Sequence, residues 1–166
     1  MRWNLKPARV VARDPANWWR NIKIDLGLRD GITTNAPVLT PDGLVGRVSE
    51  PGYTQSRVVL VGDPDCRVAV VLEGETRDNG IIAPTSSSPL DITIVDLGYL
   101  SRTSPLRPGQ KVYTSGVEGG IFPKGNLVGT IIDFRTVDFG LYNEARVKLA
   151  VNMNALEDVF VIAPSP

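Results

Sequence analysis

Apolar and polar residues alternate with a period of two along most of the chain. Between residues 18 and 26, for example, Ile22, Ile24 and Leu26 share one face, and Lys23 lies on the other. A β-strand with one buried face has this period, and β-branched residues fill nearly all of these segments. The pattern predicts strands at residues 8–13, 18–26, 36–40, 44–49, 57–61, 67–72, 80–83, 90–97, 111–114, 127–134, 144–151 and 158–162.

Helix is scarce in this pattern. Asp14 and Pro15 form a helix cap followed by proline at the first helical position, which predicts a single helical turn. Residues 152–157 predict a second short turn. The 16 glycines and 13 prolines place turns between the strands. The sequence therefore predicts an all-β fold, built as small barrels or a sandwich, with little helix.

A polar, serine-rich segment bounded by Pro84 and Pro89 interrupts the pattern near the middle of the chain. Because it lacks periodicity, it predicts a linker or an exposed loop at residues 85–89. It divides the chain into residues 1–84 and residues 90–166, with the alternative that the C-terminal strand packs back on the first part.

The two parts contain similar segments in the same order. Residues 41–48 resemble residues 123–131 if one residue is inserted, and residues 28–31 resemble residues 106–109. Coincidence and duplication both stay open as explanations, because turns of the Pro-x-Gly type are common in β proteins.

Four glycines recur in these similar segments. Gly43 and Gly125 lie in Pro-x-Gly sequences and predict turns, whereas Gly46 and Gly129 interrupt the strands that follow. A glycine inside a strand marks a bulge or a sharp bend, and such bends curl a sheet into a barrel. We therefore predict a structural role for all four.

The charges balance, and histidine is absent. The 18 Lys and Arg residues equal the 18 Asp and Glu residues, and the sequence has no run of basic residues, which argues against binding of nucleic acid. Without histidine, Ser-His-Asp and Cys-His catalysis and the usual zinc sites cannot be built. We expect no metal and no cofactor.

Cys66, the only cysteine, stands at the start of an apolar run and is interpreted as a small buried side chain. No stretch approaches the roughly 20 apolar residues that a membrane-spanning helix needs. The N-terminus has no apolar core of a signal peptide. The sequence predicts a soluble chain, and a fragment of a longer anchored protein would look the same.

Ser115 is the strongest candidate for catalysis. It lies between Thr114 and Gly116 in a glycine-rich segment, like the nucleophile of a serine protease. Without histidine, the only base that remains for it is Lys111 or Lys124. The alternative, which we favour, is a glycine-rich turn between strands, because a likeness of fold says little about activity.

Four apolar residues are candidates for an interface: Trp18, Trp19, Ile121 and Phe122. Adjacent residues on a strand point to opposite faces, so one of the two tryptophans is a candidate for an exposed anchor. The alternative, which we slightly favour, is that both pack against the single helical turn or the loop. Ile121 and Phe122 lie between turn residues, where they either plug the end of a barrel or contact another chain. For Phe122 we favour the plug.

Several segments together resemble the rod shape-determining protein MreC family. The most specific are Arg13-Asp14-Pro15-Ala16-Asn17-Trp18-Trp19 and Gly119-Gly120-Ile121-Phe122-Pro123-Lys124-Gly125. Between them, in the family's order, come residues 37–48, Ser56-Arg57-Val58, Asp63-Pro64 and Thr114-Ser115-Gly116. There are three departures from the family's pattern. Glu118 lengthens the Ser-Gly turn, Asn126 replaces a residue that is usually apolar, and the segment from Pro84 to Pro89 replaces a less polar connection.

This resemblance implies two small β-barrels, at residues 1–84 and 90–166, arranged somewhat like a chymotrypsin-type protease without its catalytic residues. It implies a non-catalytic scaffold of the bacterial cell-elongation machinery on the extracytoplasmic, periplasmic face of the cytoplasmic membrane. An N-terminal helix, which the sequence given does not contain, would anchor it.

The resemblance also implies partners. These are further copies of the same chain, the elongation-specific class B penicillin-binding transpeptidase, and MreD with the MreB cytoskeleton. Two alternatives of other classes stay open. One is a degenerate Ser-Lys hydrolase that uses Ser115, and the other is a peptidoglycan-binding module in which Trp18 or Trp19 stacks on sugar.

Overall fold

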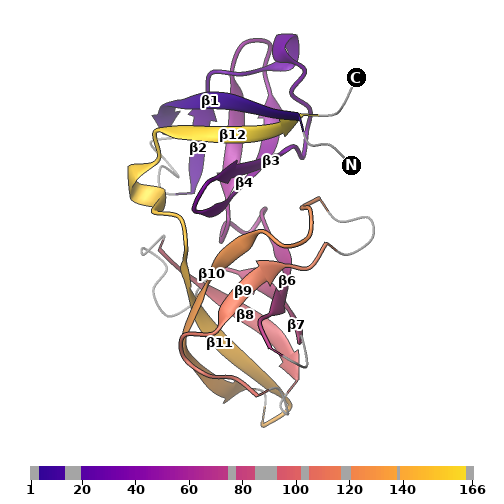
Figure 1. The fold of residues 1–166 in the computed structure, drawn as a ribbon, viewed down its shortest axis with the longest axis vertical. Helices are drawn as coiled ribbons and strands as arrows, with labels where there is room; N and C mark the ends of the chain where they lie inside the picture. The colour runs from indigo at the N-terminus through magenta and orange to yellow at the C-terminus, as the bar shows by residue number, and fades with distance from the viewer. Residues whose placement is uncertain are drawn as a thin grey trace.

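The computed structural model describes residues 4–13, 20–74, 78–84, 93–101, 105–116, 121–137 and 139–163. Within these residues the chain forms two closed six-stranded β-barrels, which Figure 1 shows one above the other. The all-β, two-barrel fold expected from the sequence is confirmed.

The first barrel contains β1 (Asn4–Arg13), β2 (Asn21–Ile24), β3 (Pro37–Thr40), β4 (Gly43–Pro51), β5 (Ser56–Leu60) and β12 (Asp158–Ala163). The second contains β6 (Val68–Leu72), β7 (Asn79–Ala83), β8 (Ile94–Ser101), β9 (Lys111–Thr114), β10 (Leu127–Val137) and β11 (Tyr142–Leu149). Two short 3-10 helices, η1 (Leu28–Asp30) and η2 (Met153–Ala155), lie in the connections.

Each of these strands overlaps a segment that the period-two pattern predicts. In β11, for example, Ala145, Val147 and Leu149 are buried in the barrel and Lys148 is exposed. Burial of one face explains why the pattern predicts the strands so well. The predicted turn at residues 152–157 contains η2. Asp14, Pro15 and the 85–89 segment lie outside the described residues.

The predicted boundary between the two barrels is wrong. β6 and β7, at residues 68–83, pair with β9 and β8 and so belong to the second barrel. The first barrel takes β12, which pairs with β1 and β3, in agreement with the alternative that the C-terminal strand packs back on the first part. The polar 85–89 segment joins two neighbouring strands of one barrel, where a connection is as polar as a linker between domains. Composition therefore could not locate the boundary.

The two barrels have the same order of strands. β7 to β11 pair with one another as β1 to β5 do, and β6 occupies the place of β12. All of these pairs are antiparallel. The barrels differ only in where the sixth strand stands in the chain, before the other five or after them. Because the repeat is permuted, the boundary between the barrels cannot be located from the order of segments in the sequence.

Gly46 and Gly129 follow equivalent bulges in the two barrels. The register between β3 and β4 shifts at Val45, and the register between β9 and β10 shifts at Val128. The carbonyl of each bulged residue accepts a hydrogen bond from a backbone N–H just after the next strand, at 2.9 Å for Val45 and 3.0 Å for Val128. The similarity of the two sequence segments thus corresponds to a structural repeat.

The close approach of a neighbouring strand requires glycine at both positions. A Cβ atom on Gly46 would lie 1.9 Å from the carbonyl oxygen of Val59, and one on Gly129 would lie 2.3 Å from that of Lys148. Real Cβ atoms do not approach backbone so closely, so another residue would push the two strands apart.

The barrels meet along a continuous apolar core, because the buried residues of both form one cluster. Gly43 begins β4 directly after a turn, with φ of 153°, and a Cβ atom there would come within 2.5 Å of the carbonyl oxygen of Leu127 in the other barrel. Gly125 lies in a turn, with φ of 88°. The Arg47 guanidinium on β4 donates to the carbonyl of Asp65, which ties the first barrel to the connection with the second.

Candidate protein-interaction surface

Of the four apolar residues predicted for an interface, the structure describes two. Phe122 is only 8 % exposed and belongs to the core, so its side chain is a plug rather than part of a free surface. Ile121 beside it is 38 % exposed. Trp18 and Trp19 lie outside the described residues.

A network of hydrogen bonds on Thr114 holds the loop that seats Phe122. The Thr114 hydroxyl donates to the carbonyl of Pro123 and accepts from the N–H of Asn126 at 2.9 Å. The Asn126 side chain donates to the same carbonyl at 3.0 Å. Asn126, a departure from the family's pattern, therefore has a defined role in fixing this loop.

Ser115 does not show the geometry of an activated nucleophile. Its N–H donates to the carbonyl of Ala69 at 3.1 Å. Its hydroxyl oxygen is buried and has no hydrogen-bond partner among the described residues. A Ser-Lys mechanism needs the amine within hydrogen-bonding reach of this oxygen. The next residue, Gly116, has φ of 64°, as the glycine-rich turn predicts.

Cys66 is buried, as expected, with 1 % of its surface exposed. Burial raises the pKa of its thiol to about 12, because the thiolate would lose its hydration. The thiol is therefore neutral at physiological pH and unsuited to nucleophilic chemistry.

Exposed apolar side chains gather at the end of the second barrel. We call Tyr99, Phe139, Leu141 and Tyr142 the tyrosine surface. The rings of Tyr99 and Tyr142 meet edge to face with centroids 6.5 Å apart, and Tyr99 is 69 % exposed. Figure 1 shows the turn between β10 and β11 at the end of the molecule opposite the first barrel. Clustered exposed aromatic residues of this kind mark interaction sites.

Local backbone geometry directs these side chains outward. Tyr99 has φ of 61° where the register between β8 and β11 shifts, and such a bulge re-aims a side chain. Phe139 has φ of 56° in the turn after β10 and is fully exposed. Positive φ in a bulky residue is costly and tends to persist at functional sites.

Two depressions lie on the second barrel, and the first of them includes Tyr99 and Tyr142 of the tyrosine surface. One, of about 310 Å³, is lined by Arg67, Ile81, Ala83, Pro84, Asp96, Gly98, Tyr99, Tyr142, Asn143 and Glu144. The other, of about 300 Å³, is lined by Asp96, Asp133, Phe134, Arg135, Glu144, Ala145 and Arg146. The two depressions share Asp96 and Glu144 and are therefore adjacent, and we call them together the groove, with aromatic residues in the first and charged residues in the second.

Ion pairs order the charged residues of the groove. The Arg146 guanidinium donates to both carboxylate oxygens of Asp133, from Nε at 2.9 Å, and this hydrogen bonding lowers the pKa of Asp133. Arg135 Nη2 lies 3.1 Å from Glu144 Oε1. Both pairs join β10 to β11, and their side chains are partly exposed to solvent. Exposed charges of this kind can favour a partner of complementary charge.

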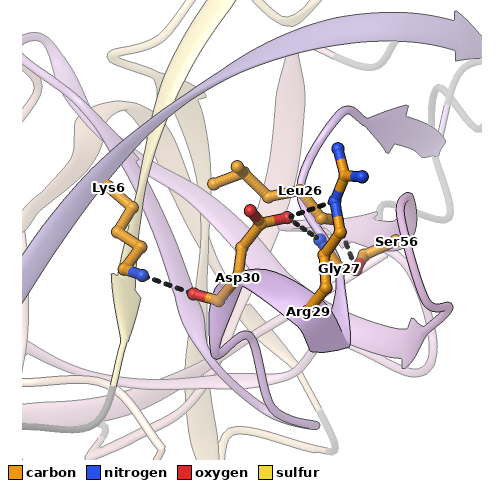
Figure 2. A network of polar contacts seen from close by, with 6 residues as sticks. All are labelled: Lys6, Leu26, Gly27, Arg29, Asp30 and Ser56. Carbon is orange, nitrogen blue, oxygen red and sulfur yellow. Dashed lines mark hydrogen bonds and ion pairs between the residues drawn. The ribbon is translucent and has the colours of Figure 1, made fainter. Parts of the chain in front are cut away.

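A smaller apolar pair, Leu28 and Tyr53, is exposed on the first barrel. The N–H of Leu28 donates to Gly52 at 2.8 Å, which brings the two loops together. Figure 2 shows the polar contacts that fix η1. Asp30 Oδ2 accepts from the Gly27 N–H at 3.0 Å, the Lys6 ammonium donates to the Asp30 carbonyl, and the Ser56 hydroxyl donates to Leu26 at 2.8 Å.

The described residues contain no cluster of three or more His, Cys, Asp or Glu side chains that could hold a metal ion. None of their helices is long and apolar enough to cross a bilayer.

Comparison with known proteins decides the family. The family model described as "Rod shape-determining protein MreC, barrel core" matches residues 10–163. The chain belongs to the MreC family. The cell shape-determining protein MreC of Listeria monocytogenes is 36 % identical over 160 residues, which cover 95 % of this chain and 53 % of that protein. The chain thus spans about half the length of this relative.

Solved MreC structures share the fold. A Listeria MreC structure superposes with a TM-score of 0.88 at 33 % identity, over 99 % of this chain and 78 % of that one. Two others are less than 25 % identical and show the fold alone. One is the major periplasmic domain of the cell shape-determining filament MreC, with a TM-score of 0.81, 23 % identity and coverage of 98 % and 97 %. The other is MreC in a complex with penicillin-binding protein PBP2 from Helicobacter pylori, with a TM-score of 0.75, 15 % identity and coverage of 99 % and 100 %.

The pattern of hydrophobic positions does not predict the tyrosine surface. Part of this surface has a sequence feature that could have revealed it. Phe139 and Leu141 flank Gly140, so they are apolar residues in a turn, as Ile121 and Phe122 are. For Tyr99 the local signal is Gly98 beside it, because a glycine inside a strand marks a bulge, but this signal does not show that the bulge exposes the next side chain.

Proposed function

We propose that this MreC chain is a non-catalytic scaffold domain of the bacterial cell-elongation machinery. It works on the periplasmic, extracytoplasmic side of the cytoplasmic membrane, to which an N-terminal helix of the full-length protein anchors it. It binds the elongation-specific class B penicillin-binding transpeptidase, self-associates, and couples wall synthesis to MreD and the MreB cytoskeleton.

The tyrosine surface carries this proposal. Aromatic residues are enriched in protein interfaces, and two contacting tyrosines beside a groove supply the anchors that dominate binding energy. Its neighbouring charges, on Asp133, Arg135, Glu144 and Arg146, provide a polar rim. MreC from Helicobacter pylori has the same fold and forms a complex with PBP2. This complex supports a penicillin-binding protein as the partner that binds the tyrosine surface.

The scaffold acts by shifting the population of its partner. A domain without catalytic groups changes the activity of a transpeptidase only if it binds the active arrangement more tightly than the inactive one. The lack of histidine and the isolated Ser115 hydroxyl support binding rather than catalysis as the function of this domain.

The test is a binding titration with the extracytoplasmic part of the class B transpeptidase from the same organism. We expect the double variant Y99A/Y142A to weaken binding at least about tenfold, because interface tyrosines are typical hot spots. The matched control is Tyr53→Ala, which removes an equally exposed tyrosine from the first barrel.

Loss of binding in Tyr53→Ala with wild-type affinity in Y99A/Y142A would move the interface to the first barrel. Saturable binding of peptidoglycan fragments, with no binding of the transpeptidase, would instead favour the wall-binding alternative. Covalent labelling by serine-directed probes that Ser115→Ala abolishes would favour the hydrolase.

A further inference from the structure

Strand β10 has a neighbour on both sides for only part of its length. Gly129 and Thr130 pair with both β9 and β11. Ile131 continues this pairing, since its N–H donates to Gln110 at 2.9 Å and its carbonyl accepts from Gly109 at 2.8 Å. Beyond Ile131, as far as Val137, β10 pairs with β11 alone within the described part of the chain. A strand with a free edge can pair with an added strand.

Phe134 and Thr136 carry the free backbone groups of this edge. Along an antiparallel pair, the backbone groups of successive residues point alternately toward and away from the partner strand. The backbone N–H and C=O groups of Ile131 point away from β11. The bulge before Asp133 adds one residue and so shifts the direction of the backbone groups that follow by one residue. Asp133 and Arg135 therefore bond to β11, and the N–H and C=O groups of Phe134 and Thr136 point to the free edge. The Phe134 side chain is 45 % exposed.

The charges on this edge are complementary to those of a second copy that runs antiparallel. Asp133 and Arg135 stand on either side of Phe134. If the two edges pair with Phe134 opposite Phe134, each Asp133 lies opposite the Arg135 of the other copy. Opposite charges across a strand pair are stabilising, and so are paired aromatic rings. A shift of one strand by two residues would place Arg135 opposite Arg135, which is unfavourable.

The contacts inside one chain leave room for these new ion pairs. Asp133 already accepts from Arg146, and Arg135 already pairs with Glu144. A carboxylate has about four acceptor sites and a guanidinium five donors, so each has capacity for a further partner. The Asp133 and Arg135 side chains are 49 % and 66 % exposed.

We propose that two copies of this chain associate by antiparallel pairing of their β10 edges, centred on Phe134. The inference rests on the self-association within the proposed function and names the surface that carries it. The contact is small, so the pairing is weak between free domains, and it strengthens where other contacts already hold two copies close together.

Single cysteines on the edge test this register. The Cα atoms of a hydrogen-bonded antiparallel pair lie about 5.5 Å apart, within the range for a disulfide. Under mild oxidation at high concentration, we expect Phe134→Cys to form a disulfide-linked dimer. Wild type is the background control, because its only cysteine, Cys66, is buried.

Thr136→Cys is the matched control on the same edge. In the proposed register the two copies of residue 136 lie about 13 Å apart along the strands, so no disulfide forms. Equal cross-linking of Phe134→Cys and Thr136→Cys, or cross-linking of Arg135→Cys alone, would overturn the proposed pairing.

Sedimentation of the chain without added cysteines gives an independent test. We expect wild type to shift toward dimer as its concentration rises and Phe134→Lys to stay monomeric, because the proposed register would place two lysines directly opposite each other. Tyr53→Lys changes a more exposed aromatic residue on the first barrel, far from this edge in the fold, and should dimerise like wild type. A Phe134→Lys variant that still dimerises would overturn the proposal.

This test uses only the chain itself and leaves the titration with the transpeptidase untouched. A chain that binds the transpeptidase through Tyr99 and Tyr142 but never dimerises through β10 would remove this inference alone. A chain that dimerises but does not bind the transpeptidase would remove the proposed partner alone.

Discussion

Phe122 illustrates how burial and hydrogen bonding act together on one side chain. Pro123 restricts Phe122 to extended geometry, and the hydrogen bonds on Thr114 fix the loop that follows. The ring thus enters the core, whereas Ile121 next to it stays partly exposed. Two adjacent apolar residues therefore have different energetic roles.

The substitution Phe122→Ala should lower the free energy of unfolding by about 3–5 kcal/mol, as for other core aromatic residues. This loss of stability has two parts. The smaller side chain buries less apolar surface, and the substitution leaves a cavity in the core. Chemical denaturation of the variant and wild type measures the difference.

Ile121→Ala is the control for this loop, and we expect it to cost less than Phe122→Ala because its side chain is partly in solvent. An unchanged midpoint for Phe122→Ala, together with weaker binding to a partner, would reassign Phe122 to an interface.

At the scale of the strand, bulges followed by glycine shape both barrels. β4 and β10 carry the bulge at equivalent positions, and the glycine after each lets the next strand approach. These bulges increase the local twist and bend that close a six-stranded sheet. The two strands therefore repeat the same device in the two barrels.

Substitution of Gly46 or Gly129 by Val should destabilise the chain by about 1–3 kcal/mol, through a clash with backbone that cannot move freely. Thermal or chemical denaturation measures this loss.

Gly98→Val provides the comparison, since a Cβ atom at Gly98 meets nothing within 4 Å. Wild-type stability for Gly46→Val and Gly129→Val would show that the strands separate there without cost and that the bends depend on other residues.

At the scale of the whole molecule, the chain crosses between the barrels twice. The first crossing follows β5, and the second follows β11 and carries η2. Arg13 of the first barrel donates to the carbonyl of Met153 in η2, and Arg47 donates to Asp65 in the first crossing. The second barrel is continuous in sequence, whereas the first is assembled from both ends of the chain.

A fragment of residues 61–151 should therefore fold alone, because it contains β6 to β11 and closes the second barrel. A fragment of residues 90–166 should not, because it lacks β6 and β7. The dispersion of amide signals in two-dimensional NMR spectra distinguishes the two outcomes. A folded 90–166 fragment would contradict the observed boundary.

The sequence by itself determined the strands and the character of the fold. A period of two along β11, with Ala145, Val147 and Leu149 on one side, is dictated by local geometry and burial, so it is visible without any partner strand. The same holds for the turn before Gly43 and the turn at Gly125. Gly46 and Gly129 were also predictable, because the two segments that contain them resemble each other.

Only the tertiary structure decided which strands share a barrel. Whether β6 pairs with β9, or β12 with β1, depends on contacts between residues far apart in the chain, and no local pattern encodes them. The exposure of Tyr99 and the free edge of β10 have the same origin. Each arises because a neighbouring strand ends or shifts its register, and a residue's own sequence does not record where its neighbour stops.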